Sequence, residues 1–256
     1  MPNLLQIQGL RSKYKSQSPI SKSEVKLLSE SYNRSLYEIK ASFQSHSLST
    51  NLVTYFEEQR SANIVMLFID ITNFSEKCKS LTNSQLSIFL DKYYDTVIPR
   101  IYGQGGEIEK IIGDGIICIF GEPFLKDSKS DLFKKADQAS KDIIMDLKST
   151  DKEVKIAIHD GSIMYYKNKT LNYPEYTMIG KPLTELFRLE SVSNNNSINF
   201  SSISSYDAME ISKEGVYKMT GNNTHSYWKK SDRIAVALKG VDWSGMKYFE
   251  CTYKTS

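Results

Sequence analysis

The pattern of apolar and polar positions changes near residue 60. The preceding segment is rich in Ser, Gln and Lys, and its apolar residues recur at steps of three and four, which is typical of an amphipathic helix. Ser21 or Ser23 would provide the N-cap of this helix. Its apolar positions are Val25, Leu28, Tyr32, Leu36, Ile39 and Phe43. We expect residues 1–60 to form a helical arm that packs on the following domain; a short dimerising helix is the alternative, although about three heptads is marginal for a coiled coil.

From residue 61 onwards, short apolar runs alternate with amphipathic segments. Asn63–Ile71 is almost continuously apolar and is interrupted only by Asp70 near its end, which predicts a buried central strand. Two shorter runs on either side of Gly113-Asp114 predict a β-hairpin. A later run predicts either a strand pair or one long strand broken at Asp160-Gly161. The predicted strands are Asn63–Ile71, Glu107–Ile112, Gly115–Phe120, Val154–Tyr166, Tyr176–Ile179, Ser197–Phe200, Arg233–Leu238 and Met246–Tyr253.

Apolar residues at helical spacing predict helices between these strands. The first helix would begin at Asn83 or Ser84 and be stopped by Gly103 and Gly105-Gly106. The later predicted helices are Asp131–Lys148, Leu183–Glu190 and Ser202–Met209. The order β-α-β-β-α-β is the ferredoxin-like pattern, here extended by a C-terminal αβ portion. We therefore predict an α+β fold with one domain over residues 61–256 behind the N-terminal arm.

Composition excludes several functional classes. With 256 residues, 40% hydrophobic, 25% charged and a formal net charge of +3, the chain is too weakly basic to have nucleic acid as its main partner. Cys78, Cys118 and Cys251 are too far apart to indicate a zinc site or a disulfide framework. The N-terminus lacks the apolar stretch of a signal peptide, and Ile64–Ile69 is too short to span a membrane. We therefore expect a cytoplasmic protein with no membrane span.

Two carboxylates are placed where chemistry could occur. Asp70 ends an apolar strand, and Asp114 lies in the tight turn of the predicted hairpin. In a β-α-β-β order the first strand commonly lies beside the hairpin, so the two side chains could meet at one edge of the sheet. Paired carboxylates can hold Mg²⁺ or Mn²⁺ for phosphate chemistry. The alternative is that Asp70 only caps the next segment and Asp114 is only a turn residue.

Four segments together resemble the class III nucleotide cyclases. They are Phe68–Ser75, Gly105–Asp114, Tyr176–Gly180 with Arg188 eight residues after its glycine, and Lys239-Gly240 before the last predicted strand. Their order and spacing extend the resemblance over residues 62–250. The resemblance implies an enzyme that converts a nucleoside triphosphate to its 3′,5′-cyclic monophosphate and pyrophosphate. It favours metal binding by Asp70 and Asp114 over the capping and turn roles.

The resemblance also implies roles for individual residues. Asp70 and Asp114 would bind two ions of Mn²⁺ or Mg²⁺, with the carbonyl of Ile71 as a further ligand. The residues implied in substrate binding are Thr72, Asn73, Phe74 and Ser75 at the β- and γ-phosphates, Lys239 at the triphosphate, and Lys110 and Thr177 at the base. Arg188 would stabilise charge at the α-phosphoryl group. In the family the metal-binding and base-reading residues face each other across a dimer, so a homodimer with shared active sites is implied.

The reaction requires residues of these types. A ribose 3′-hydroxyl attacks the α-phosphorus in line while pyrophosphate leaves; one metal lowers the pKa of that hydroxyl, and the other neutralises the leaving charge. Fixed cations such as Arg188 and Lys239 stabilise the negative charge that develops. No protein nucleophile is needed. His46, His159 and His225 therefore need no role, and we expect His159 to be structural.

Three departures mark this chain as a divergent member of the family it resembles. Thr184 stands where the family often has an Asn that orients the ribose; its hydroxyl can donate a hydrogen bond over a shorter reach, so we place it in the catalytic set. Lys181 occupies a position that is often acidic, and Tyr165–Glu175 differs from the usual pattern. These departures leave a catalytically inactive, nucleotide-binding regulatory module as an alternative.

The base that the enzyme reads is the least determined property. A lysine donor with a threonine hydroxyl suits a base edge that pairs an acceptor with an amino group, as adenine and cytosine do. An unpaired polar group in such a pocket costs about 1–3 kcal/mol, which makes GTP the poorest candidate. The Lys110–Thr177 pair resembles that of many adenylate cyclases. The short build and the divergent Lys181–Thr184 region resemble the pyrimidine cyclases of Pycsar anti-phage systems, whose product activates a separate effector. We predict a pyrimidine cyclase, CTP before UTP, with an adenylate cyclase as the alternative.

Overall fold

A computed structural model describes Tyr55 and residues 58–167, 176–201, 217–218, 225–232, 234–235 and 247–255. The predicted arm over residues 1–60 lies almost wholly outside the described residues, as do the predicted helix at 202–209 and Lys239. Within the described part, no helix is long and apolar enough to cross a membrane.

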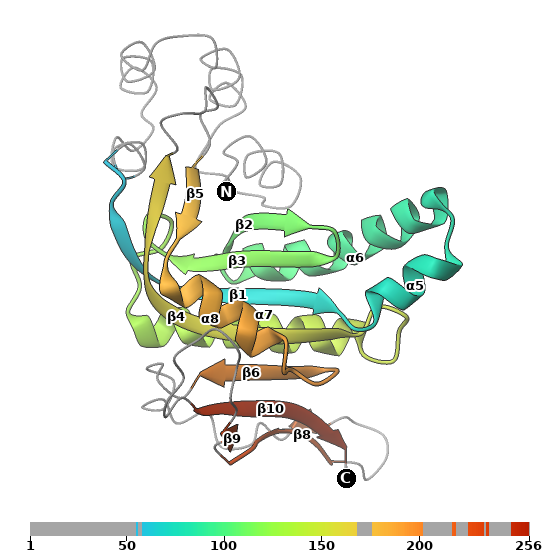
Figure 1. Cartoon of the computed structure of the whole chain (residues 1–256). Helices are drawn as coiled ribbons and strands as arrows, with labels where there is room; N and C mark the ends of the chain where they lie inside the picture. Colours follow the sequence, from blue (N-terminus) through green and yellow to red (C-terminus); the bar gives the residue numbers. More distant parts are fainter. Residues whose placement is uncertain are drawn as a thin grey trace.

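The described domain is a ten-stranded sheet with four helices (Figure 1). The strands are β1 (Ser61–Ile71), β2 (Glu107–Ile112), β3 (Gly115–Gly121), β4 (Val154–Lys167), β5 (Tyr176–Ile179), β6 (Ser197–Ser201), β7 (Tyr217–Lys218), β8 (His225–Lys230), β9 (Ile234–Ala235) and β10 (Lys247–Thr255). The helices are α5 (Phe74–Ser80), α6 (Asn83–Gly103), α7 (Lys129–Leu147) and α8 (Lys181–Glu190).

The strand order is β2-β3-β1-β4-β6-β10-β8-β7, with β5 paired to β4 and β9 paired to β10. The first four of these strands, with the helices that connect them, form the predicted ferredoxin-like unit. β1 lies between β3 and β4 and pairs antiparallel with both, so that Ile69 faces Ile116 on one side and Ile156 on the other. The prediction that the first strand lies beside the hairpin is therefore confirmed.

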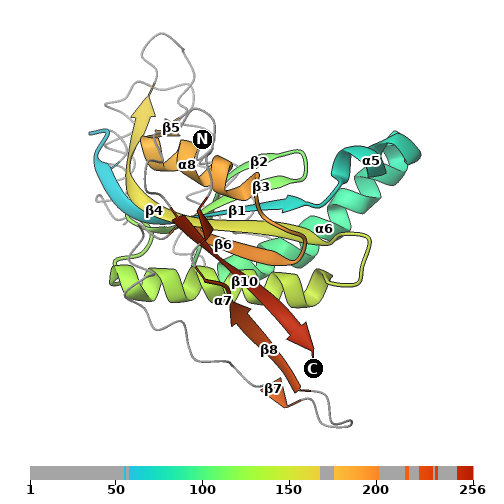
Figure 2. The ribbon, with the colours of Figure 1, turned by 60° about the horizontal axis from the view of Figure 1, so that its bottom comes forward.

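Helices cover the two faces of the sheet unequally (Figure 2). The odd-numbered residues of β1, from Val65 to Ile71, pack with α6 and α7 in the larger apolar cluster. The even-numbered residues Ala62, Ile64 and Met66 face the other way and pack in a second cluster that contains Leu186 and Leu189 of α8. Burial on both faces explains why β1 is almost continuously apolar.

Local sequence explains where the elements begin and end. α6 starts at Asn83, as predicted, because Thr82 caps it and exchanges hydrogen bonds with Gln85 in a capping box. β4 is one strand of 14 residues, so the long-strand alternative is confirmed, but the predicted break is wrong because Asp160 and Gly161 stay in register with Val65 and Ile64 of β1. Its first part pairs with β1 and its last part with β5.

Candidate active site

Asp70 and Asp114 meet at one edge of the sheet. Asp70 is the penultimate residue of β1, and Asp114 occupies the turn between β2 and β3. The backbone N–H of Ile71 donates a hydrogen bond to Oδ2 of Asp114, with an N–O distance of 3.1 Å. The three residues that the sequence assigned to the metal site therefore lie together. Within the described residues no cluster of three Asp, Glu, His or Cys side chains could hold a metal ion, so a bound cation would rely on these two carboxylates and on backbone oxygen.

Burial and the nearby charge of Asp70 perturb Asp114. The pKa of Asp114 is raised from 3.8 to about 7, first by burial and then by the charge of Asp70. Two adjacent, partly buried carboxylates form a suitable donor set for a hard divalent cation, which would hold Asp114 in the charged form. The residues present therefore fit the metal that the sequence implies.

Lys155 is a contact of Asp70 that the sequence analysis missed. Its Nζ lies 3.3 Å from Oδ2 of Asp70 and 2.6 Å from Oε1 of Glu190, the last residue of α8. The pair register places Lys155 directly opposite Asp70 on β4. The sequence signal was a single lysine in the otherwise apolar run 154–158, at an alternate position that points to the same side of the sheet as Asp70.

The predicted phosphate-binding turn follows β1 directly. Asn73 adopts a left-handed conformation (φ 56°, ψ 32°) and precedes α5 without a side-chain capping bond. Phe74 and Ser75 form the start of α5, where backbone N–H groups have no intrahelical acceptor. Thr72 differs, because its N–H donates to the carbonyl of Glu153 at 2.8 Å and its hydroxyl to Oδ1 of Asn195 at 2.8 Å. The open donors of this turn are therefore those of Phe74 and Ser75 rather than Thr72.

The two predicted base-reading residues lie on different strands, Lys110 on β2 and Thr177 on β5, and the residues next to them in sequence are in contact. Lys110 is exposed on β2 and faces Ile117 of β3, which belongs to the apolar cluster beneath α8. Thr177 is half-buried on β5. The adjacent residues make contact, because the backbone of Met178 hydrogen-bonds to the buried carboxyl of Glu109. Burial raises the pKa of Glu109, and this hydrogen bond, a smaller effect, lowers it.

The catalytic pair predicted on α8 faces away from the sheet. Thr184 and Arg188 are one helical turn apart and both are exposed. Among the described residues no hydrogen bond or ion pair joins either of them to Asp70, Asp114 or Lys110. Within one described chain, Thr184 and Arg188 thus make no direct contact with the carboxylate pair, although Lys155 links Asp70 to Glu190 at the end of the same helix.

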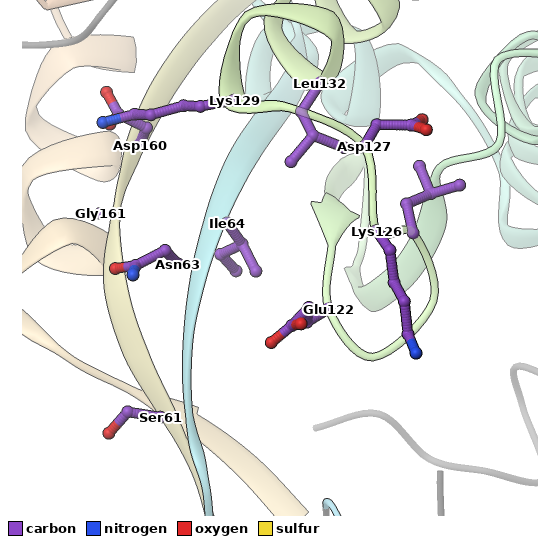
Figure 3. Close-up of a pocket in the computed structure, with 11 residues that line it drawn as sticks. Ser61, Asn63, Ile64, Glu122, Lys126, Asp127, Lys129, Leu132, Asp160 and Gly161 are labelled. Atoms are coloured by element: carbon purple, nitrogen blue, oxygen red, sulfur yellow. The ribbon is translucent and has the colours of Figure 1, made fainter. Parts of the chain in front are cut away.

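A cavity of about 340 Å³ lies at the opposite end of β1 from Asp70 (Figure 3). It is bordered by Ser61, Asn63 and Ile64 of β1, by Asp160-Gly161 of β4 and by the start of α7. None of the predicted site residues lines it. Its lining mixes acidic, basic and apolar side chains, as the labelled sticks show, and does not resemble a triphosphate site.

Similar solved structures support the fold. An adenylyl cyclase, CyaB from P. aeruginosa, aligns with a TM-score of 0.59 and 19% identity over 75% of this chain and 95% of that one. The guanylate cyclase domain of RhGC from Catenaria anguillulae, solved with GTP, aligns with a TM-score of 0.58 and 19% identity over 76% of this chain and 99% of that one. A rhodopsin-guanylyl cyclase core with converted specificity, solved with ATPαS, aligns with a TM-score of 0.57 and 20% identity over 76% of this chain and 98% of that one. No curated protein matches the chain.

The family profile for the adenylate and guanylate cyclase catalytic domain matches residues 56–231, which is more than half of the chain. The matched segment contains the two-carboxylate turn, the β2–β3 hairpin and α8. The protein therefore belongs to the adenylate and guanylate cyclase catalytic-domain family and is, as its motifs predicted, a nucleotide cyclase, a phosphorus–oxygen lyase.

Proposed function

We propose that this cyclase forms the 3′,5′-cyclic monophosphate of a pyrimidine nucleoside triphosphate, CTP before UTP, with release of pyrophosphate. The observation that carries the cyclase chemistry is the meeting of Asp70 and Asp114 at the sheet edge, where the pKa of Asp114 is raised to about 7. Mn²⁺ or Mg²⁺ bound there would activate the 3′-hydroxyl and neutralise the leaving pyrophosphate.

The chain's own residues would bind and orient the substrate. The N–H groups of Phe74 and Ser75 point out of the start of α5 and are suited to phosphate oxygens. Lys155 adds a cation beside Asp70, and Lys239 is proposed as a further triphosphate contact. Arg188 would stabilise the charge on the α-phosphoryl group as the bond from O3′ to phosphorus forms and the bond to the leaving oxygen breaks. Thr184, one turn earlier on α8, would donate a hydrogen bond to the ribose.

We also propose that the active enzyme is a homodimer with shared sites. The metal-binding residues of one chain and the exposed Thr184–Arg188 face of α8 make no direct contact with each other in the described structure. A second copy that presents its own α8 face to Asp70 and Asp114 would complete the site, and two-fold symmetry would generate two equivalent sites.

The base preference rests on Lys110 and Thr177. The ammonium of Lys110 can donate to an unprotonated ring nitrogen, and the hydroxyl of Thr177 can accept from an exocyclic amine. Cytosine and adenine both present that combination, so an adenylate cyclase is the second candidate and the Lys110–Thr177 pair is the feature that favours it. A pyrimidine product would act as a second messenger in anti-phage defence and would be read by a separate cyclic-nucleotide-binding effector.

Turnover of four triphosphates tests the proposal. Purified protein would be incubated with Mn²⁺ and with ATP, CTP, GTP or UTP in turn, and cyclic products would be identified by mass spectrometry alongside released pyrophosphate. We expect cyclic CMP as the main product. Cyclic AMP as the main product would select the second candidate, and no cyclic product from any substrate would leave only a nucleotide-binding module.

Variants at the metal site give the matched control. Asp70→Asn and Asp114→Asn should each abolish turnover because they remove an anionic ligand. Asp91→Asn removes a carboxylate from the exposed face of α6 and should leave turnover unchanged. Full activity in Asp70→Asn would refute the metal assignment.

A further inference from the structure

α8 is attached to β4 at three points along its length. Alternate residues of β4 face the helix, and Lys155, His159 and Gly161 meet successive positions of it. Gly161 lies against Pro182, so closely that a Cβ at Gly161 would overlap the proline ring. His159 pairs with Glu185, and Lys155 pairs with Glu190. The helix therefore runs along β4 in a fixed register, with its N-terminal end at Gly161 and its C-terminal end at Lys155.

The middle attachment is a buried contact between the imidazole of His159 and the carboxylate of Glu185. Nε2 of His159 lies 2.9 Å from Oε2 of Glu185, and the two side chains are only 4% and 10% exposed. The hydrogen bond from His159 is the largest cause that lowers the pKa of Glu185. The other carboxylate oxygen, Oε1, lies 3.2 Å from Nζ of Lys181, a side chain that is 71% exposed.

Apolar contacts also hold the helix against the sheet. Leu186 and Leu189 are fully buried against the sheet and supply the apolar contact. A buried polar contact of this kind is weak evidence for added stability, because desolvation of the two groups offsets much of the interaction energy. What the His159–Glu185 hydrogen bond adds is directionality. It fixes the rotation of α8 about its own axis, whereas leucine side chains tolerate rotation.

The rotation of α8 determines where its exposed face points. On α8, Glu185 directly follows Thr184 and comes three residues before Arg188. A change in the rotation of the helix at Glu185 therefore moves the exposed side chains of both Thr184 and Arg188. We propose that His159 and Glu185 are positioning residues, which hold α8 so that Thr184 and Arg188 reach the substrate. This inference rests on the proposed catalytic roles of Thr184 and Arg188 and assigns a function to a histidine that the chemistry itself leaves unused.

Three variants of the full chain test the proposal. Glu185→Leu removes the pair but keeps a helix-forming, apolar side chain beside Leu186. Glu185→Gln keeps an oxygen that can accept the hydrogen bond from Nε2 of His159. Lys181→Gln is the matched control, because it removes only the exposed partner of the same carboxylate. Circular dichroism and thermal unfolding would confirm that each variant is folded.

We expect Glu185→Leu to lower kcat roughly 10- to 100-fold, the cost of a misplacement near 1 Å, with the triphosphate KM changed less than about threefold. The KM is spared because the phosphate-binding turn lies on β1 and α5. Glu185→Gln should restore most of the loss, and Lys181→Gln should match the wild type. In an Arg188→Ala background, Glu185→Leu should have a much smaller further effect, since the pair acts through that residue.

Two results would overturn the positioning role: an unchanged kcat in Glu185→Leu, or an equal loss of kcat in the presence and absence of Arg188. Hydrogen exchange provides a readout that does not depend on turnover. Glu185→Leu should increase amide exchange in α8 and leave β1 and α6 unchanged. If the wild type produced no cyclic nucleotide, the proposed function would fail by itself, and unchanged exchange in α8 would then still refute the positioning pair.

Discussion

Asp114 is the residue whose environment most clearly departs from that of an ordinary surface carboxylate. Its pKa rises from 3.8 to about 7 because the side chain is partly buried and lies beside Asp70. The folded protein therefore binds this proton more tightly than the unfolded chain does. As the pH rises from 3.8 towards 7, the unfolded chain loses the proton first, so the contribution of Asp114 to stability falls over that window and stays low above it.

This fall in stability with rising pH gives a prediction for the metal-free protein. Its melting temperature should decrease between about pH 4 and about pH 7 by an amount that includes the Asp114 contribution. Asp114→Asn should reduce that decrease, because the amide cannot ionise, whereas Asp91→Asn should not. Differential scanning calorimetry in the presence of a chelator would measure both. A pH dependence that is identical in Asp114→Asn and the wild type would contradict the raised pKa.

Lys155 gives a second prediction at the residue scale. It pairs at 2.6 Å with Glu190, whose side chain is only 9% exposed. Lys155→Gln should destabilise the fold by about 1–3 kcal/mol, since a buried carboxylate then loses its charged partner. Lys79→Gln removes a lysine from a pair of similar length, 2.7 Å, in which both side chains are about 70% exposed, and should cost less than about 0.5 kcal/mol. Chemical denaturation would compare the two, and equal losses would contradict the burial argument.

At the scale of elements, the end of α6 shows how glycines act. The sequence predicts that Gly103 and Gly105-Gly106 stop this helix, and the helix ends at Gly103. Gly105 has a φ of +82°, a conformation that favours glycine. Gly106 is packed so tightly that an added Cβ would lie 2.7 Å from Cζ of Phe120 and 2.9 Å from Cγ2 of Ile101.

Two alanine substitutions should therefore behave differently. Gly106→Ala should destabilise the protein by about 1–3 kcal/mol, because the methyl group overpacks the core between Phe120 of β3 and Ile101 of α6. Gly103→Ala has nothing within 4 Å of its added Cβ and should be neutral or slightly stabilising. Urea denaturation of both variants would test this, and a neutral Gly106→Ala would show that Phe120 can move aside.

The elements that the sequence predicted well are those with a buried face. The central strand, the hairpin, α6 and α7 all carry an apolar pattern that matches their burial, and each was placed within about two residues. α5 was missed because none of its residues is buried, so it has no apolar period to detect. The alternatives at Asp160-Gly161 could not be resolved from the sequence, because the reason for Gly161 is the contact with Pro182, a residue 21 positions later.

The candidate site also contains residues that the sequence could predict and residues that it could not. Asp70 and Asp114 were predicted to meet because strand order alone brings their strands together, and the structure confirms that neighbourhood. Lys155 and Glu185 were missed because their roles depend on the pairing register of β4 and on the rotation of α8. Both are properties of tertiary packing that an isolated sequence pattern does not determine.

At the scale of the whole molecule, the proposed homodimer, in which Arg188 of one chain serves Asp70 of the other, predicts complementation between chains. A homodimer of Asp70→Ala chains and a homodimer of Arg188→Ala chains should each be inactive. In a mixed dimer, one site carries both substitutions and the other carries neither. An equimolar mixture that exchanges freely should therefore recover about one quarter of the wild-type sites, since half of the dimers are mixed and each has one intact site.

The control for this experiment combines Asp70→Ala with Asp114→Ala. Both changes affect the metal half of the site, so every site in the mixed dimer is damaged and no activity should return. Differently tagged chains, purified through both tags, would establish that mixed dimers are present. Recovery in the first mixture and not in the second is expected only if Arg188 serves the carboxylates of the opposite chain. An inactive first mixture, in verified mixed dimers, would mean that Arg188 and the carboxylates must belong to the same chain, and the exposed face of α8 would then need another explanation.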